Sequence, residues 1–405
     1  MTADPTPEQW RNRMVEVLRR PGVVGAEFLS PRVERALRTV PRHLFIPEAD
    51  LPQAYDPFSP VMTKRDEEQV VVSSVSAPQI QAMMLAQADL GPGDHVLEVG
   101  SGGYNAALIA EVIGPQGEVT TVDIDPDITD RARTLLDANG YERVRVVTAD
   151  AAHGVEEGAP YDAIIVTAGA WDIPPAWVAQ LVEGGRLVVP LRVRDLTRSI
   201  AFVRSGEVLE STSALVCGFV SMRGEDDHQQ TPLRLSDTGE IVLVFDDEAP
   251  TDPRLLDHAL RTPRVELWTG VRVAPQEPID GLQLYLATTL PGFCVMRVDP
   301  ALDTGLVAPN SHRFSMAAVE GGDFAYLVTR RTGTWVEYGV HGLGPMAGAF
   351  AEQVARRIRE WDRDRRGGPG PRIQVYPVST PIDRLNADRV ITKRHTHIAF
   401  SWPTP

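Results

Sequence analysis

The chain has 405 residues, a length that predicts two domains rather than one. Hydrophobic residues make up 43% of it, which is enough to bury a core and excludes a disordered protein. The formal net charge of −15 argues against broad nucleic-acid binding, which needs a positive surface, and we interpret it as an aid to solubility.

Signals for a disulfide, a metal or a membrane are weak. Cys217 and Cys294 lie in apolar runs without paired spacing, so we expect buried thiols. His395 and His397 would share one face of a strand, but no acid or cysteine lies at ligand spacing, so no metal site is expected. No signal-peptide pattern opens the chain, and no apolar run approaches the roughly 18 residues of a membrane span. We expect a cytoplasmic protein without membrane or nucleic-acid partners.

The first 72 residues are predicted to form a helical region and the loop that leads into the first domain. Residues 8–47 have a helical pattern, which Pro41 ends. A Pro- and Asp-rich loop follows over 50–60, and then a charged hinge over 64–68.

From residue 77 onward, helical and strand patterns alternate as far as residue 190. We expect helices at 77–90, 105–113, 127–139 and 175–181, and strands at 96–99, 119–122, 144–148, 163–167 and 186–190. Alternation of this kind predicts an α/β fold with a parallel sheet covered by helices. Strand-like runs at 199–203 and 215–222 would complete the sheet as an antiparallel edge.

The polar stretch 224–230 marks the predicted domain boundary. Beyond it we expect a second, α+β domain over residues 225–405. Its predicted elements are short strands at 241–245, 282–286, 293–298, 324–328 and 335–338, a helix at 346–361, and terminal strands at 373–378 and 398–402.

A glycine turn follows the first predicted strand of the α/β region. It reads Gly100-Ser101-Gly102-Gly103-Tyr104 and opens a helix. Glycines let a ligand approach the backbone, and the N-terminus of a helix offers free N–H groups. The chain lacks Gly-x-Gly-x-x-Gly and Gly-Lys-Ser/Thr at this turn, which disfavours a phosphate cradle. On its own, the turn is equally typical of simple packing.

Two acids sharpen the interpretation of the glycine turn. Asp123 ends the second strand about 20 residues after the glycines, where a carboxylate can accept both ribose hydroxyls. Asp150 ends the third strand, where a carboxylate can accept from an adenine amino group. Each acid alone is also typical of a solvated strand end. The three features in register favour an adenosine ligand without phosphates, and S-adenosylmethionine (SAM) fits that description.

From about residue 27 to 224, the chain resembles the protein-L-isoaspartate O-methyltransferase family. The resemblance rests on five motifs: the helix at 32–47 with Val40-Pro41-Arg42-His43, Val75-Ser76-Ala77-Pro78, the strand and turn at 96–102, the strand at 161–170, and Gly184-Gly185-Arg186-Leu187. It implies a Rossmann-like, SAM-dependent methyltransferase domain with a doubly wound, mostly parallel sheet. Residues 73–224 would be its SAM-binding core, and S-adenosylhomocysteine would be the product.

The resemblance also assigns roles to residues. It implies a catalytic role for Ser76 at the methyl-transfer centre. It implies that SAM is held by Ser76, Glu98, Gly100, Ser101, Gly102, Gly103, Tyr104, Asp123, Ile124, Asp150 and Ala151. The substrate would be contacted by Val75, Ala77, Pro78, Gln79, Thr167 and Ala168. A carboxylate nucleophile is already ionised near pH 7, so transfer needs alignment rather than a base. Ser76 is equally typical of a helix N-cap.

The chain departs from the family pattern at three places that concern contacts with SAM or recognition of the substrate. The glycine loop is one residue short, Gln79 stands where histidine is frequent, and residues 67–72 replace a short Gly-Glu-Gly-Gln segment. With its C-terminal extension, the chain resembles larger actinobacterial members associated with ribosomally made, modified peptides. That resemblance implies methylation of a peptide aspartate, leading to aspartimide or isoaspartate, with residues 225–405 as a candidate for peptide recognition. The alternatives are repair of isoaspartyl proteins and a scaffold that has lost catalysis.

Overall fold

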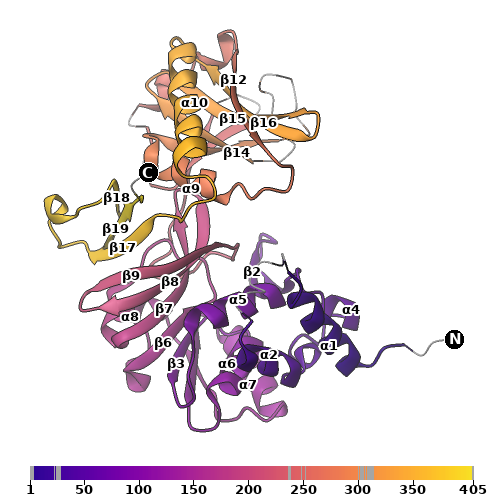
Figure 1. Cartoon of the computed structure of the whole chain (residues 1–405). Coiled ribbons are helices and arrows are strands. Elements are labelled where there is room, and N and C mark those ends of the chain that lie inside the picture. The colour runs from indigo at the N-terminus through magenta and orange to yellow at the C-terminus, as the bar shows by residue number, and fades with distance from the viewer. Residues whose placement is uncertain are drawn as a thin grey trace.

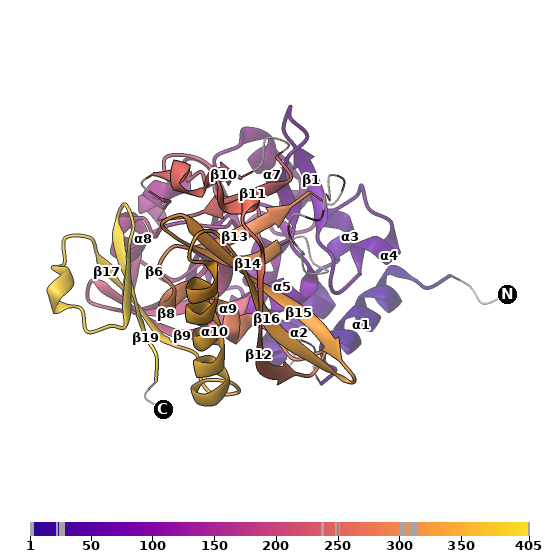
Figure 2. The ribbon, with the colours of Figure 1, turned by 90° about the horizontal axis from the view of Figure 1, so that it is seen from above.

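The computed structural model describes residues 4–21, 23, 29–235, 239–247, 249–250, 252–299, 301, 305, 307 and 314–403. Within this part of the chain, most strands belong to two large sheets that lie one above the other (Figure 1). Seen from above, the second sheet and the last helix lie over the first sheet, and the N-terminal helices extend to one side (Figure 2).

The first sheet is ten-stranded among the described residues, in the order β18-β19-β17-β9-β8-β7-β6-β3-β4-β5. Its strands are β3 (His95–Val99), β4 (Glu118–Asp123), β5 (Arg145–Thr148), β6 (Tyr161–Val166), β7 (Leu181–Val193), β8 (Leu196–Ser205), β9 (Val208–Val216), β17 (Arg372–Pro377), β18 (Arg389–Thr392) and β19 (Thr396–Ser401). The neighbours from β5 to β7 pair in parallel, and the remaining neighbours pair antiparallel. The predicted α/β sheet is therefore confirmed.

Helices cover both faces of the parallel part, because alternate strand residues point to opposite sides. They are α1 (Pro7–Leu18), α2 (Pro31–Thr39), α3 (Arg42–Phe45), α4 (Leu51–Ala54), α5 (Pro78–Ala88), α6 (Tyr104–Ile113), α7 (Pro126–Ala138) and α8 (Pro175–Gln180). Val96 and Ala163 pack into one core with α2, α5 and α6. Leu97 and Ile164 pack into the other core with Trp177 of α8.

Three local predictions in the first domain are wrong. The predicted loop 50–60 contains the short helix α4. The predicted hinge 64–68 belongs to a hairpin made of β1 (Val61–Arg65) and β2 (Val71–Val75). The predicted strand 215–222 is mostly irregular, because β9 ends at Val216. Antiparallel strands follow β7 in the sheet as predicted, and they continue beyond β8 and β9, since β17 pairs with β9.

The second sheet is antiparallel, in the order β10-β11-β13-β14-β15-β16-β12 over the described residues. Its strands are β10 (Thr231–Arg234), β11 (Ile241–Phe245), β12 (Val265–Val273), β13 (Phe293–Val298), β14 (Phe314–Glu320), β15 (Asp323–Thr332) and β16 (Trp335–Leu343). The helices α9 (Asp280–Thr289) and α10 (Ala347–Asp364) pack on one of its faces. The predicted long helix is thus confirmed.

The predicted strand 282–286 is wrong, because these residues form part of α9. Their Leu-x-Leu-x-Leu alternation is typical of a strand. In the fold, Leu282, Tyr285 and Leu286 have helical spacing and pack together into the core below the second sheet.

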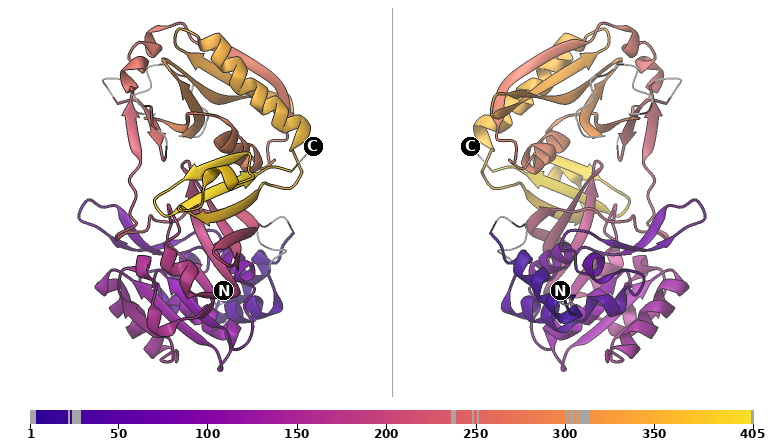
Figure 3. Two further views of the ribbon diagram at one scale, coloured as in Figure 1. Left: turned by 90° about the vertical axis from the view of Figure 1, so that its left-hand side faces the viewer. Right: turned by 90° about the vertical axis from the view of Figure 1, so that its right-hand side faces the viewer.

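The chain returns to the first sheet after α10. The strands β17, β19 and β18 extend that sheet beyond β9 and lie between the two bodies (Figure 3). The chain leaves the first sheet at the end of β9, Val216, shortly before the predicted boundary near Gly224, and strands between residues 372 and 401 rejoin that sheet.

A buried arginine organises the N-terminal side of the first domain. Arg42 is fully buried, and its guanidinium donates to the carbonyl of Ala54 (2.8 Å), to Gln81 Oε1 (2.8 Å) and to the carbonyl of Ser76 (2.9 Å). It also lies over the ring of Tyr104, 4.9 Å from the centroid. Burial lowers the pKa of Arg42 to about 10, so the group stays charged at neutral pH.

A second buried polar group lies beneath the glycine turn. Glu98 accepts hydrogen bonds from Asn105 Nδ2 (2.9 Å) and Thr121 Oγ1 (2.6 Å), which join β3 to α6 and β4. Burial raises the pKa of Glu98 to about 7, although these two hydrogen bonds act in the opposite direction.

Arg42→Met should lower the free energy of unfolding by about 2–4 kcal/mol, because it leaves several buried carbonyl oxygens without donors. Arg38→Met is the matched control: Arg38 forms partly exposed ion pairs with Glu16 and Glu34, so its loss should cost at most about 1 kcal/mol. Chemical denaturation of both variants measures the difference. Equal losses would contradict the organising role of Arg42.

Glu98 predicts a pH-dependent stability. Its pKa in the folded protein lies above the unfolded value, so the folded state retains the proton longer as pH rises. The free energy of unfolding should therefore fall by about 2–4 kcal/mol between about pH 5 and pH 7. Glu98→Gln cannot ionise and should lack this component; its amide oxygen can accept from Asn105 Nδ2, and its amide nitrogen can donate to the Thr121 hydroxyl oxygen. Chemical denaturation at several pH values measures this change. If the free energy of unfolding changed equally with pH in both proteins, the assigned role of Glu98 would be wrong.

Candidate functional site

A cleft of about 600 Å³ lies at the carboxyl ends of β3, β4 and β6. Its floor comes from the residues that end these strands, Val99–Gly102, Val122–Ile124 and Thr167–Ala168. Its outer walls come from Val72–Ser74 on β2 and from Val220–Arg223, which follow β9. Ligands of open α/β sheets bind at this end of the strands.

The glycine turn leaves the floor of the cleft open. Gly100 has a φ of +97°, and a Cβ there would lie 2.5 Å from Thr167 Oγ1. The Thr167 hydroxyl donates to the carbonyls of Val99 (2.9 Å) and Gly100 (3.1 Å), which fixes the neighbouring strand end against the turn. Both the conformation and the contact require glycine at position 100.

Asp123 is positioned as the acid of the cleft. Its Oδ2 accepts from the Ser101 N–H (3.1 Å) and its Oδ1 from the Asp125 N–H (3.0 Å). Burial raises the pKa of Asp123, and these hydrogen bonds counteract the rise. A carboxylate oxygen has capacity for further donors, so Asp123 can also accept from vicinal hydroxyls.

An ion-pair cluster closes one side of the cleft. Lys64 on β1 lies 2.8 Å from Asp125 Oδ2 and 2.7 Å from Asp127 Oδ2. Arg223 lies 3.1 Å from the same Asp125 oxygen. The β1–β2 hairpin is thereby tied to the start of α7 and to the segment after β9.

A second pocket, of about 1030 Å³, adjoins the cleft and shares Ser74 and Val220 with it. Its other lining residues are Phe58, Pro60, Met62, Val71, Ser76, Ala77, Ile80, Gly218 and Phe219. Among these described residues there is no titratable side chain, so the pocket offers hydroxyls and apolar surface but no general acid or base.

Many of the predicted site residues line one of the two pockets. Those lining the cleft are Gly100, Ser101, Gly102, Asp123, Ile124, Ala151, Thr167 and Ala168. Ser76 and Ala77 line the second pocket. Ser76 is not the N-cap of α5, because that position is Ala77.

Other predicted site residues lie outside both pockets. Glu98 and Tyr104 are fully buried below the turn, where Tyr104 lies under Arg42. Gly103 has a φ of +77°, which favours glycine, and a Cβ there would make only an ordinary contact with Phe45 at 3.5 Å. Pro78 begins α5.

Asp150, Val75 and Gln79 also lie apart from the two pockets. The Asp150 carboxylate accepts from the N–H groups of Ala152 (2.9 Å) and Glu225 (2.8 Å), so the chain near residue 225 covers it. The side chain of Val75 is buried beside the cleft, and the Gln79 N–H donates to the Pro57 carbonyl (3.0 Å).

Sequence reasoning missed the outer walls of the cleft. Ser73 and Ser74 directly precede the predicted site segment 75–79 but are not among the predicted site residues. Residues 220–222 lie inside the predicted strand 215–222, and Arg223 directly follows it. A polar pair such as Ser221 and Arg223 at the end of an apolar strand pattern is the signal that could have identified them.

Two further observations concern the described residues. They contain no group of three or more His, Cys, Asp or Glu side chains arranged to hold a metal ion. No helix in the same part of the chain has the length and apolar character that a membrane crossing requires.

Comparisons with known proteins point to one family. The model of the protein-L-isoaspartate(D-aspartate) O-methyltransferase family matches residues 9–226. Protein-L-isoaspartate O-methyltransferase 2 of Archaeoglobus fulgidus is 42% identical over 202 residues, 49% of this chain and 87% of that protein. Protein-L-isoaspartate O-methyltransferase of Hyperthermus butylicus is 39% identical over 232 residues, 54% of this chain and 92% of that protein.

The fold is shared beyond the matched region. A solved structure named protein-L-isoaspartate O-methyltransferase covers 97% of this chain and 100% of its own, with a TM-score of 0.51 and 20% identity. Because the family model matches more than half of the 405 residues and the cleft lies inside that match, the chain belongs to the protein-L-isoaspartate(D-aspartate) O-methyltransferase family, whose members are SAM-dependent carboxyl methyltransferases.

Proposed function

We propose that this protein uses SAM to methylate the free carboxylate of isoaspartyl residues in damaged proteins and peptides. The observation that carries the proposal is the pair of adjoining pockets. One is an open cleft over a glycine turn and an acid, and the other offers hydroxyls and apolar surface without a titratable group.

The residues of the cleft fit SAM. Gly100 lines the cleft and carries no side chain, and Asp123 can accept from ribose hydroxyls. Gly100, Ser101, Gly102, Asp123, Ile124 and Ala151 would hold the donor. When bound, SAM supplies a methyl group on a positively charged sulfur that can pass to a carboxylate oxygen.

The second pocket suits a nucleophile that is already ionised. A carboxylate needs no base at neutral pH, and none lines this pocket among the described residues. Ser76 can donate a hydrogen bond that orients the carboxylate. Phe58, Ile80 and Phe219 form apolar walls that exclude water from it. Methylation makes the carboxyl group a better acylating centre, so the next backbone nitrogen can attack the ester carbon, break its bond to the methoxy oxygen and close a succinimide, with methanol leaving.

Repair is favoured over maturation of a ribosomally made peptide. This chain matches the two isoaspartate methyltransferases named above over 87% and 92% of their own length. The C-terminal extension gives no support to the natural-product alternative, because a solved structure with the same family name covers 97% of this chain.

The proposal predicts discrimination between two peptides that differ only in one linkage. With SAM carrying a labelled methyl group, a synthetic isoaspartyl peptide should become a methyl ester, and the same peptide with normal aspartate should not. Mass spectrometry checks both, as a gain of one methylene or a later loss of methanol. Methylation of the aspartyl peptide alone, or only of a modified precursor peptide, would contradict repair. Calorimetric SAM binding without turnover on any of them would favour the scaffold alternative.

Ser76→Ala should lower kcat on the isoaspartyl peptide by about 10- to 100-fold, the effect of losing one hydrogen bond to a charged group, and leave the SAM Kd unchanged. Ser59→Ala is the control, because the Ser59 hydroxyl donates to Asp56 outside the pocket. Full turnover by the Ser76 variant would remove that residue from the mechanism.

A further inference from the structure

One wall of the cleft consists of two irregular segments that lie side by side. We call residues 167–170 and 220–223 the cleft wall. The Gly169 N–H donates to the Val220 carbonyl (2.7 Å), and the Met222 N–H donates to the Gly169 carbonyl (2.9 Å). Gly169 and Ser221 form an isolated bridge rather than part of a strand. The wall therefore lacks the regular ladder that would otherwise fix it.

Both segments continue into residues that the C-terminal part of the chain binds. The buried carboxylate of Asp172 accepts from the Thr396 hydroxyl and from the His395 N–H (2.7 Å). The buried carboxylate of Asp226 lies 2.9 Å from Arg394 Nη1 and 2.8 Å from His395 Nε2. Residues 394–396 thus contact the continuation of each half of the cleft wall at once.

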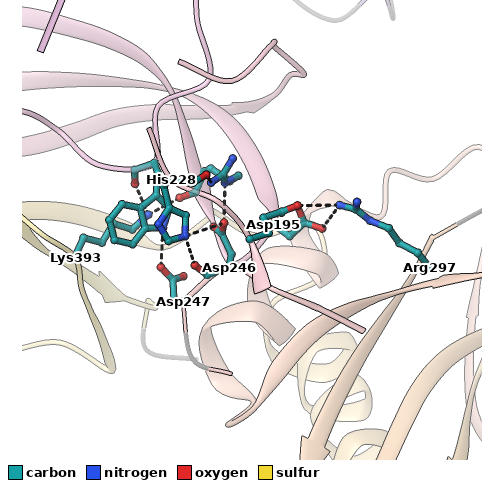
Figure 4. A network of polar contacts seen from close by, with 9 residues as sticks. Asp195, His228, Asp246, Asp247, Arg297 and Lys393 are labelled. Carbon is teal, nitrogen blue, oxygen red and sulfur yellow. Dashed lines mark hydrogen bonds and ion pairs between the residues drawn. The ribbon is translucent and has the colours of Figure 1, made fainter. Parts of the chain in front are cut away.

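Lys393 binds the segment that continues from residues 167–170. Its buried ammonium donates to the carbonyls of Trp171 and Arg192 and lies 4.9 Å from the centroid of the Trp171 ring (Figure 4). His228 stacks on that ring, with 3.8 Å between centroids and 6° between planes.

The second sheet contributes to this support. The Trp171 indole donates to Asp247 Oδ1 (3.0 Å), and Arg192 Nε donates to Asp246 Oδ1 (2.8 Å), as the dashed lines of Figure 4 indicate. Both acids follow directly after β11. The segment after β6 is therefore bound from both the second sheet and the returning C-terminal strands.

We propose that residues 393–396, the C-terminal clasp, hold the cleft wall in the arrangement that binds SAM. This inference rests on the proposed use of the cleft for SAM. The clasp connects β18 to β19, which belong to the ten-stranded sheet, so its donors come from a rigid element. Fixing an irregular wall before binding reduces the ordering cost at binding, which strengthens affinity. The residues of the clasp are positioning residues, since they act through Asp172 and Asp226.

Thr396→Val and Asp172→Asn test the clasp, because both keep the shape of the side chain. The first removes the hydroxyl that donates to Asp172, and the second replaces one of the two carboxylate oxygens that accept from residues 395 and 396. Each variant should raise the SAM Kd by about three- to tenfold, measured by calorimetry, since a lost hydrogen bond costs about 1 kcal/mol. The KM for an isoaspartyl peptide should change little. Amide hydrogen exchange without SAM should become faster in residues 167–172, which lead to Asp172, and in residues 219–228, which are bonded to them through Gly169.

Thr396→Ser and Thr392→Ala are the matched controls. Serine keeps the hydroxyl that donates to Asp172 and should restore wild-type affinity. Thr392 bonds His397 within the same hairpin without reaching the cleft wall, so its variant should bind SAM normally.

Unchanged SAM Kd and unchanged exchange in both test variants would overturn the clasp. An equal loss of affinity in Thr392→Ala would also overturn it, because that result indicates general destabilisation. If the wild-type protein bound no SAM, the proposed function would fail instead, and the exchange measurement would still decide whether residues 393–396 order the wall.

Discussion

A buried positive charge lies behind the two pockets, and among the described residues its hydrogen-bond partners are carbonyl and amide oxygens rather than carboxylates. The guanidinium of Arg42 uses its planar fork of donors to bind the carbonyls of Ala54, Val75 and Ser76 and the side chain of Gln81. It also lies over Tyr104, the residue after the glycine turn. One side chain therefore sets the spacing between the Ser76 pocket and the turn beneath the cleft. Removing its partners would leave an uncompensated buried charge, which is far more costly than losing a surface contact.

The helices and strands of the α/β region could be predicted from the sequence alone. The strands and helices of the α/β region were found because hydrophobic periodicity, glycines and prolines mark them directly in the sequence. The glycine turn and Asp123 were found because the carboxyl ends of neighbouring parallel strands meet at one edge. In contrast, the alternation of Leu282, Leu284 and Leu286 satisfies a strand pattern, and only packing below the second sheet selects the helix.

Long-range contacts explain what the sequence could not predict at the site. Asp150 stands at a strand end, as a ligand-binding acid would, and its partly exposed carboxylate also accepts from the Glu225 N–H, 75 residues later. Glu98 and Tyr104 belong to the right motif, yet their side chains point into the core below the turn. The return of β17 to β9 pairs residues such as Gln374 and Glu210, which are 164 positions apart, and no local signal announces such a pairing.

The central claim is that a methyl donor and a substrate carboxylate meet where the cleft joins the Ser76 pocket. The most direct measurement is a crystal structure of the protein with S-adenosylhomocysteine and an isoaspartyl peptide. The nucleoside should contact Gly100–Gly102 and Asp123, and the free carboxylate should lie beside the Ser76 hydroxyl. A nucleoside bound elsewhere, or a Ser76 pocket closed by protein atoms with the peptide outside it, would contradict the account.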